Sequence, residues 1–387
     1  MEKERTQERK TLFVLSTIIF ILYASQVQFR PIFPQYVELR GGGVAAVGLA
    51  IFLNWFAQAI LAIPSGSLSD KIGRKATTII GAIIAAVGLF LLPVASTVIL
   101  IMLFYFIAGM GQGAYSTATA AYPVDLAKSG QAGRAIGWSQ AARQSALSFG
   151  PAIGGMLATF SDFNTVFIIS ALMCVAAASI SWVKLPDLRQ KKPIVKTKYS
   201  FRNAISNPMI LGCIVATFSL QFSNSVFLSF VPLYAKHLPI AIIGVVFTVQ
   251  GLMNVVGRPL VGEFSAKISR RVLAISLGMV SGAASMMVLS FSSSFEFLVA
   301  SAILLGFSTG ISIVLLLTIV AEQSPGEKRG FVIGFHNTAI YLGLGTGSVI
   351  EGFVIENFGY TIAFQSSALL TLVGLILFAA LSSLKTK

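Results

Sequence analysis

The sequence predicts an all-α membrane protein in which twelve transmembrane helices form two pseudo-symmetric six-helix bundles. Three observations predict this architecture. Of 387 residues, 55% are hydrophobic and 11% are charged, whereas soluble domains carry about 25% charged residues. Apolar runs long enough to cross a bilayer recur along the chain. Sequence patterns of the first half also reappear in the second half at a nearly constant offset.

Twelve segments meet the requirement of about 20 apolar residues for a membrane-spanning helix. They cover residues 12–36, 44–65, 76–95, 97–121, 134–157, 164–184, 208–233, 241–261, 272–292, 296–320, 331–354 and 361–383. The mixed-charge start 1–10 leads directly into a long apolar segment. We therefore expect a retained first helix and not a cleaved signal peptide.

Basic residues gather in every second loop. Of the 28 Lys and Arg residues, 23 fall on one side of the predicted topology. Only Arg40 and Lys236 fall on the other side, while Arg30, Arg143 and Arg258 lie within helices. By the positive-inside rule, we expect both termini in the cytoplasm and the protein in the cell membrane. The net charge of +14 thus reflects topology, and no nucleic-acid partner is expected.

Residues 186–207 divide the chain, because they carry Pro186, Pro193 and a run of lysines between six apolar segments and six more. We interpret them as a cytoplasmic linker that contacts anionic lipid headgroups. This interpretation gives an N-terminal bundle at 1–185 and a C-terminal bundle at 208–387.

An internal repeat supports that division. Pairs of similar patterns are separated by 196 to 198 residues: Pro34-Gln-Tyr36 and Pro232-Leu-Tyr234, Gly66…Arg74-Lys75 and Gly262…Arg270-Arg271, Gly109…Gly113…Asp125 and Gly306…Gly310…Glu322, Gly137…Gly150…Gly155 and Gly334…Gly347…Gly352. In this alignment Ala266 stands where the first copy has Asp70. Duplicated parallel halves predict a substrate path between them near the membrane midplane.

The stretch Gly66-Ser-Leu-Ser-Asp70-Lys-Ile-Gly73-Arg74-Lys75 predicts a tight polar loop between the second and third helices. We expect Gly66 to permit close helix packing and Gly73 to form a turn that needs no Cβ. The spacing Gly-x-x-x-Asp-Lys-x-Gly-Arg-Lys resembles the loop signature of the major facilitator superfamily. The resemblance implies the fold of that family and a conformational latch between the bundles, in which Arg74 reaches Asp125. The latch comprises Gly66, Asp70, Gly73, Arg74, Lys75 and Asp125.

Two further segments resemble motifs of the same family. Gly150-Pro151-Ala-Ile-Gly154-Gly155 in the fifth helix is similar to the Gly-Pro-x-x-Gly-Gly motif of its exporters, which implies a hinge associated with antiport. The alternative is a packing seam of small residues. The fourth helix carries the family's glycines from Gly109 onward, but Tyr105 replaces an arginine. The proton-transfer role of that arginine is therefore not expected here.

Arg143 is the leading candidate for substrate binding. It follows the start of the fifth helix near Arg134 by nine residues, which places it roughly 14 Å into the membrane. Gln140 and Gln144 lie on the same helical face. Arg30 shares a stripe with Tyr23 and Gln26 on the first helix, where it either faces a cavity or extends to the interface.

Other polar side chains recur at helical spacing and predict a wet cavity. Those assigned to substrate binding are Gln26, Gln112, Tyr115, Gln221, Asn224, Asn254, Asn337 and Tyr341, with Asn54, Gln58, Thr119 and Gln250 as neighbours. Hydrogen bonding between helices is the alternative role for each of them.

No carboxylate is expected near the membrane midplane. Candidates for a titrating group are Glu351, Asp125 and His336, although packing is the more natural role of His336. Cys174 and Cys213 lie in apolar segments and offer neither a disulfide framework nor a metal site. We expect no cofactor.

The sequence therefore predicts a secondary active transporter that exports a drug or a metabolite by proton-coupled antiport with alternating access. The alternative within transport is an importer or exchanger of an organic anion that uses Arg30 and Arg143. A membrane receptor would need a soluble output domain, and a membrane enzyme would need a catalytic cluster; neither is visible in the sequence. We expect a monomer in the lipid bilayer that binds a small-molecule substrate and is not an enzyme.

Overall fold

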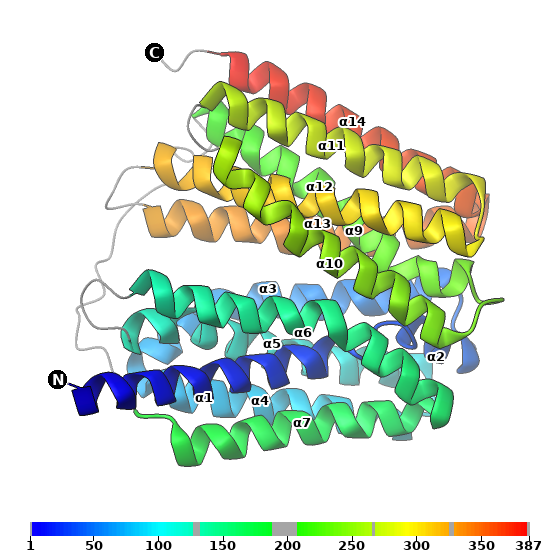
Figure 1. Cartoon of the computed structure of the whole chain (residues 1–387). Coiled ribbons are helices and arrows are strands. Elements are labelled where there is room, and N and C mark those ends of the chain that lie inside the picture. Colours follow the sequence, from blue (N-terminus) through cyan, green and yellow to red (C-terminus); the bar gives the residue numbers. More distant parts are fainter. Residues whose placement is uncertain (1, 127–131, 188–206, 265–267, 325–328, 385–387) are drawn as a thin grey trace. The chain divides into compact units, whose positions relative to one another are not determined.

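The computed structural model describes residues 2–126, 132–187, 207–264, 268–324 and 329–384. All regular structure in these ranges is helical (Figure 1). Its long helices are α1 (Glu2–Val27), α3 (Val44–Ile72), α4 (Arg74–Leu91), α5 (Val98–Leu126), α6 (Ala132–Phe160), α7 (Phe163–Lys184), α9 (Pro208–Tyr234), α10 (Ile240–Phe264), α11 (Ile268–Phe291), α12 (Phe295–Gln323), α13 (Arg329–Phe358) and α14 (Tyr360–Ser383). Two short helices, α2 (Phe33–Leu39) and the 3-10 helix η1 (Leu92–Val94), connect longer ones.

The long helices confirm the all-α prediction. Within the described residues, 11 of them are long and apolar enough to cross a membrane. The remaining long helix, α6, has 29 residues, which is ample for a span. It is less apolar than the spans within the other long helices because it carries Arg134, Gln140, Arg143 and Gln144.

The predicted first span 12–36 is wrong in its second half. Helix α1 ends at Val27, and residues 28–32 turn before α2 begins at Phe33. Pro31 explains the break, because its ring would clash with the carbonyl of Val27 in a continuing helix. Arg30 consequently lies in the break and not on a helical stripe with Tyr23.

The polar segment after the second span is also more helical than predicted. Helix α3 continues to Ile72, and α4 begins at Arg74. Gly73 alone makes the turn, with a φ of 99° that side-chain-bearing residues rarely adopt. Gly66 is not required for close packing, because an added Cβ would meet Thr117 Cγ2 at an ordinary 3.6 Å.

The helices pack into two compact units. Unit 1 comprises Met1–Gly42, Leu53–Pro193 and Pro239–Thr248, whereas unit 2 comprises Gly43–Phe52, Ile194–Leu238 and Val249–Lys387. The first turns of α3 therefore group with unit 2, and those of α10 group with unit 1. The division at 186–207 stays a prediction, because most of that segment lies outside the described residues.

The internal repeat reappears as a repeated packing contact. In unit 1, a Cβ on Gly113 of α5 would lie 2.9 Å from the carbonyl oxygen of Gln58 on α3. In unit 2, a Cβ on Gly310 of α12 would lie 2.4 Å from the carbonyl oxygen of Asn254 on α10. Both contacts are too close for a side chain, so the repeated glycines let two helices approach closely in each unit.

Candidate functional site

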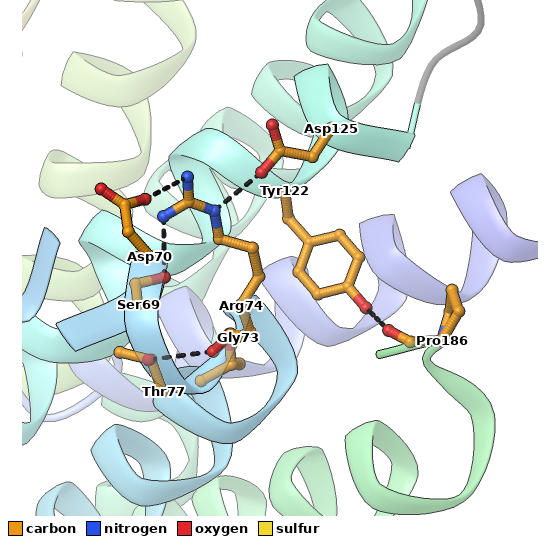
Figure 2. A network of polar contacts seen from close by, with 9 residues as sticks. Ser69, Asp70, Gly73, Arg74, Thr77, Tyr122, Asp125 and Pro186 are labelled. Carbon is orange, nitrogen blue, oxygen red and sulfur yellow. Dashed lines mark hydrogen bonds and ion pairs between the residues drawn. The ribbon is translucent and has the colours of Figure 1, made fainter. Parts of the chain in front are cut away.

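Arg74 is the centre of a polar network at the junction of α3 and α4 (Figure 2). Its Nη2 lies 2.7 Å from Asp70 Oδ1, and its Nε donates to Asp125 Oδ2 on α5 at 2.7 Å. Its Nη1 also donates to Ser69 Oγ at 3.0 Å. The guanidinium thus engages α3 and α5 together, which its planar fork of donors permits.

The two ion pairs of Arg74 differ in burial. The side chains of Arg74 and Asp125 are 9% and 7% exposed, while that of Asp70 is 42% exposed. Removing one partner of a buried ion pair costs about 3–5 kcal/mol, because a charge remains buried, whereas an exposed pair contributes about 0–1 kcal/mol. Asp125 therefore carries the structural share of the network, and Asp70 is free to change partners at low cost.

Nearby contacts fix the same end of unit 1. Lys75 Nζ lies 5.8 Å from the centre of the Trp182 ring on α7, within cation–π range. Tyr122 of α5 donates its hydroxyl hydrogen to the carbonyl of Pro186, just after α7 (Figure 2). Helices α4, α5 and α7 are therefore joined near Arg74.

Unit 2 contains a counterpart of this network, in a register different from the predicted one. Arg271 Nη1 lies 2.5 Å from Glu322 Oε2, so Arg271 and not Arg270 corresponds to Arg74. Because Gly262 keeps an offset of 196 and Arg271 has an offset of 197, the second copy has one extra residue between them. The counterpart of Asp70, predicted at Ala266, falls in the segment 265–267 and lies outside the described residues.

The fifth-helix motif lies where α6 packs against the end of α1. A Cβ on Gly154 would lie 1.6 Å from the carbonyl oxygen of Gln28, and a Cβ on Gly150 would lie 2.4 Å from Val27 Cγ2. Since real Cβ contacts are essentially never under 3.0 Å, the backbone obstacle makes glycine necessary at position 154, whereas a side chain at position 150 would require the Val27 side chain to move. Gln28 was not a predicted site residue. It lies three residues before Pro31, and that proline was the sequence signal for the end of α1.

The other side of the motif packs on the first turns of α10, which belong to unit 1. A Cβ on Gly155 would lie 2.9 Å from the carbonyl oxygen of Ile240, and a Cβ on Gly244 would lie 2.6 Å from that of Pro151. The motif therefore permits close backbone approach on two of its faces.

Arg143 and Gln140 line an open cavity in unit 1. The Arg143 Cζ lies 4.8 Å from the centre of the Tyr23 ring on α1, a cation–π contact. The cavity holds about 30 Å³ of water-accessible space and is lined by Ile19, Tyr23, Thr119, Ala120, Pro123, Ile136, Ser139, Gln140 and Arg143. This space accommodates ordered water or one small polar group of a larger ligand. Gln144 is partly buried and does not belong to this lining.

Ser139 was not predicted, although it lines the same cavity. Its side chain is 6% exposed, and its Oγ has no hydrogen-bond partner among the described residues. A buried hydroxyl of this kind suits a ligand or an ordered water, since buried polar groups normally find a partner. The sequence offered one indication of this role, namely that Ser139 immediately precedes the predicted site residue Gln140.

Two predicted residues of unit 1, Arg30 and Tyr115, do not belong to the lining of that cavity. Arg30 is partly buried, and its Cζ lies 5.8 Å from the centre of the Trp55 ring on α3. Tyr115 is fully buried, and its hydroxyl donates to the carbonyl oxygen of Leu22 at 3.2 Å. Tyr115 therefore joins α5 to α1 in this structure.

Gln26 and Gln112 belong to an amide network that joins α1, α3 and α5. Gln112 Oε1 accepts from Gln26 Nε2 at 3.0 Å and from Gln58 Nε2 at 3.1 Å. Gln58 Nε2 also donates to Asn54 Oδ1 at 2.9 Å, and Asn54 Nδ2 donates to the carbonyl of Tyr105 at 2.9 Å. All four amide side chains belong to residues less than 10% exposed. In this conformation, their donors and acceptors serve helix packing.

Polar residues of unit 2 form shorter chains. Gln250 Nε2 donates to Asn224 Oδ1 at 2.9 Å, which joins α10 to α9. Asn254 Nδ2 donates to Thr309 Oγ1 at 2.9 Å, while its Oδ1 accepts from Arg258 Nη2 at 3.1 Å. Gln250, which bonds to Asn224, lies one turn before Asn254 on α10.

The remaining predicted residues do not gather at one place. Gln221 is buried on α9 and faces Gly343 of α13. A Cβ added to Gly343 would lie 3.0 Å from the Cβ of Gln221. Asn337 is exposed on α13, and Tyr341 is partly buried one turn further along it.

Long apolar helices, two units with repeated packing and a polar cavity in unit 1 define a multi-pass membrane protein of the transporter class. The family model for the Major Facilitator Superfamily matches residues 15–240 and again residues 213–386. The chain belongs to this family, whose members are transporters and not enzymes and move small-molecule substrates.

Individual proteins agree with that assignment. An uncharacterized transporter of the family from Methanocaldococcus jannaschii, MJ1560, is 23% identical over 94% of this chain and 96% of its own length. The quinolone resistance protein NorA of Staphylococcus aureus is 24% identical over 90% of each chain. Among solved structures, a bacterial homolog of the human lysosomal transporter Spinster superposes with a TM-score of 0.81 at 12% identity, over 97% of this chain and 96% of that one. At that identity, the superposition establishes the fold alone.

Proposed function

We propose that this protein exports small molecules, either drugs or metabolites, by proton-coupled antiport with alternating access. The observation that carries the proposal is the full-length similarity to a quinolone resistance protein. A full-length match covers both halves of the transporter, and both halves are needed to enclose a substrate.

The Gly150–Gly155 segment supports the exporter assignment. Its glycines allow backbone contacts that no other residue would permit, both against α1 and against the start of α10. Contacts of this kind can re-form as two packed surfaces separate and close again, because they involve no interlocked side chains. We assign the segment a hinge role in alternating access.

We place the substrate beside Arg143 and Gln140. Their cavity combines a cation, an aromatic ring and the hydroxyls of Thr119 and Ser139, a mixture of apolar walls and a few polar groups that suits small molecules. The other predicted polar residues would line the rest of the path: Arg30, Gln26, Gln112, Tyr115, Gln144, Gln221, Asn224, Asn254, Asn337 and Tyr341. Several of these would have to exchange their present hydrogen bonds for contacts to substrate.

The latch proposal assigns Asp70 and Arg74 to the cytoplasmic face of the cell membrane, with both termini on that side. The charge distribution supports this orientation, since basic residues are retained on the cytoplasmic side. We propose a monomer as the functional unit, because each chain carries both repeats.

Transport of an organic anion, by import or exchange, is the second candidate function. Among the described residues, no carboxylate lies within ion-pair distance of Arg143, which leaves its charge available to an anion. A cation in that position would favour a carboxylate or phosphate substrate over a cationic drug.

The test is transport by the purified protein in proteoliposomes with an imposed pH gradient and a clamped membrane potential. Fluorescent cationic dyes and organic anions would be compared as substrates. Antiport predicts dye movement that stops when the pH gradient is dissipated. Transport that continues unchanged would reject proton coupling, and movement of anions alone would select the second candidate.

A further inference from the structure

Glu351 is a buried carboxyl group inside a membrane-spanning helix. It lies on α13, seven residues before the helix ends at Phe358, or about 10 Å from that end. The residue is 2% exposed. Asp125 is the other described carboxylate with a side chain below one-tenth exposure, and it pairs with Arg74. Glu351 has no ion pair among the described residues.

The helices packed around α13 offer Glu351 no compensating charge. Helices α9 and α14, and the first turns of α3 at 44–52, contain no Asp, Glu, Lys, Arg or His. Helix α12 carries Glu296, which is exposed near its start, and Glu322, which pairs with Arg271 near its end. The other titratable groups on α9, α13 and α14 are Cys213, Tyr234, Arg329, His336, Tyr341, Glu356 and Tyr360. Arg329 is the first residue of α13 and lies 22 residues before Glu351, or about 33 Å along the helix. His336 bonds to Thr217, and Glu356 accepts from the Ala45 amide.

Ser366 on α14 supplies the hydrogen-bond contacts of Glu351. Its Oγ lies 2.9 Å from Glu351 Oε1 and 3.0 Å from Oε2, and it lies 2.9 Å from the carbonyl oxygen of Ala363. A serine hydroxyl has one hydrogen. It therefore cannot donate to the carboxylate and to the Ala363 carbonyl at the same time.

Counting hydrogens shows which protonation state satisfies this arrangement. If Glu351 is protonated, its O–H donates to Ser366 Oγ, and Ser366 donates to Ala363, so each hydrogen is used once. If Glu351 is ionised, Ser366 has to leave Ala363 and turn toward the carboxylate. The negative charge then has one neutral donor in a buried site, where charge is strongly disfavoured.

We propose that Glu351 binds and releases the coupling proton, so that the coupling site lies in unit 2 while the Arg143 cavity lies in unit 1. The proton is held on Glu351 in the dry arrangement with Ser366. It leaves to water when a conformational change admits water to the carboxyl group, and the resulting carboxylate favours the hydrated conformation until it takes up a proton again. This inference rests on the proposed proton antiport.

The decisive experiment compares Glu351→Gln with Glu296→Gln in proteoliposomes, with ethidium as the probe. Glutamine keeps the shape of the protonated acid but cannot release a proton. We expect Glu351→Gln to lose pH-gradient-driven ethidium movement while it retains exchange of the dye without a gradient, and Glu296→Gln to behave as the wild type. Gradient-driven movement in Glu351→Gln overturns this proposal alone. A wild-type protein that ignores the gradient rejects the antiport itself.

Infrared spectroscopy of the purified full-length protein tests the site without transport. We expect a protonated-carboxyl band that disappears reversibly as the pH is raised, is absent in Glu351→Gln and persists in Glu296→Gln. Ser366→Ala should change the pH dependence of the band, since the carboxyl group loses its hydrogen-bond partner. A wild-type spectrum without such a band at any pH would overturn the proposal even if Glu351→Gln failed to fold.

Discussion

Replacing Gly154 with alanine should disrupt the contact between α6 and α1. The added Cβ would lie 1.6 Å from the carbonyl oxygen of Gln28, 2.3 Å from its carbonyl carbon and 2.8 Å from its Cα. To reach the shortest acceptable separation of 3.0 Å, one backbone must move by at least 1.4 Å. All three obstructing atoms are backbone atoms, so no side-chain rotation relieves the clash.

Overpacking of this kind costs about 1–3 kcal/mol, and a rigid backbone obstacle favours the upper end of that range. The better helix propensity of alanine returns about 1 kcal/mol at most. We therefore expect Gly154→Ala to insert into the membrane, to unfold at lower temperature in detergent and to transport poorly, and Gly154→Leu to abolish transport.

Gly137→Ala is the matched control, because Gly137 lies on the same helix and a Cβ there would have no atom within 4 Å. It gains helix propensity without a clash and should be as stable as the wild type or more so. Thermal unfolding and proteoliposome transport would be measured for both variants. If Gly154→Ala matched Gly137→Ala in stability and transport, the close contact with Gln28 would have no part in the mechanism.

Three further predictions concern charged groups. Arg143→Ala should weaken substrate binding, and Arg143→Lys should restore it only partly because lysine lacks the planar fork of donors. If a binding titration gave both variants the affinity of the wild type, Arg143 would not belong to the site. Asp125→Ala should destabilise the protein by about 3–5 kcal/mol, since it leaves a buried guanidinium short of one partner. Asp70→Asn should cost about 1 kcal/mol or less and should instead shift the conformational equilibrium toward the inward-open state. Denaturation would measure the first effect, and cysteine accessibility from each side of the membrane would measure the second. Hydrogen bonds from the Thr165 side chain and backbone lower the pKa of Asp162 at the start of α7. The contribution of Asp162 to stability is therefore complete above its unfolded pKa of about 3.9 and is lost as the pH falls through its lower folded pKa. Acid unfolding that is unchanged in Asp162→Asn would contradict this.

Hydropathy located the helices well but not their ends. An apolar run shows where a helix crosses lipid, because each lipid-facing backbone group must be hydrogen-bonded within the helix. It does not show where the helix stops. Ser69 and Asp70 are polar, yet α3 continues through them to Ile72 because polar residues form helix readily once outside the apolar layer. Conversely, Pro31 ended α1 inside an apolar run.

The candidate site was predictable only where partners lie on one helix. Gln140 and Arg143 share a face by helical spacing, and both line the same cavity. The ring that receives the Arg143 guanidinium, Tyr23, comes from another helix, and sequence periodicity carries no information on such pairs. The register of Arg271 was missed for a related reason: an extra residue between it and Gly262 is invisible until the ion pair with Glu322 is seen.

The amide network of α1, α3 and α5 has an electrical consequence. A potential of 100 mV across a membrane changes the energy of an elementary charge by about 2.3 kcal/mol. Gln26, Asn54, Gln58 and Gln112 are neutral at every physiological pH, so neither voltage nor acidity alters the bonds that join their helices. Any work that the membrane potential performs during transport must therefore act on charges elsewhere, either on ionisable side chains or on the substrate itself.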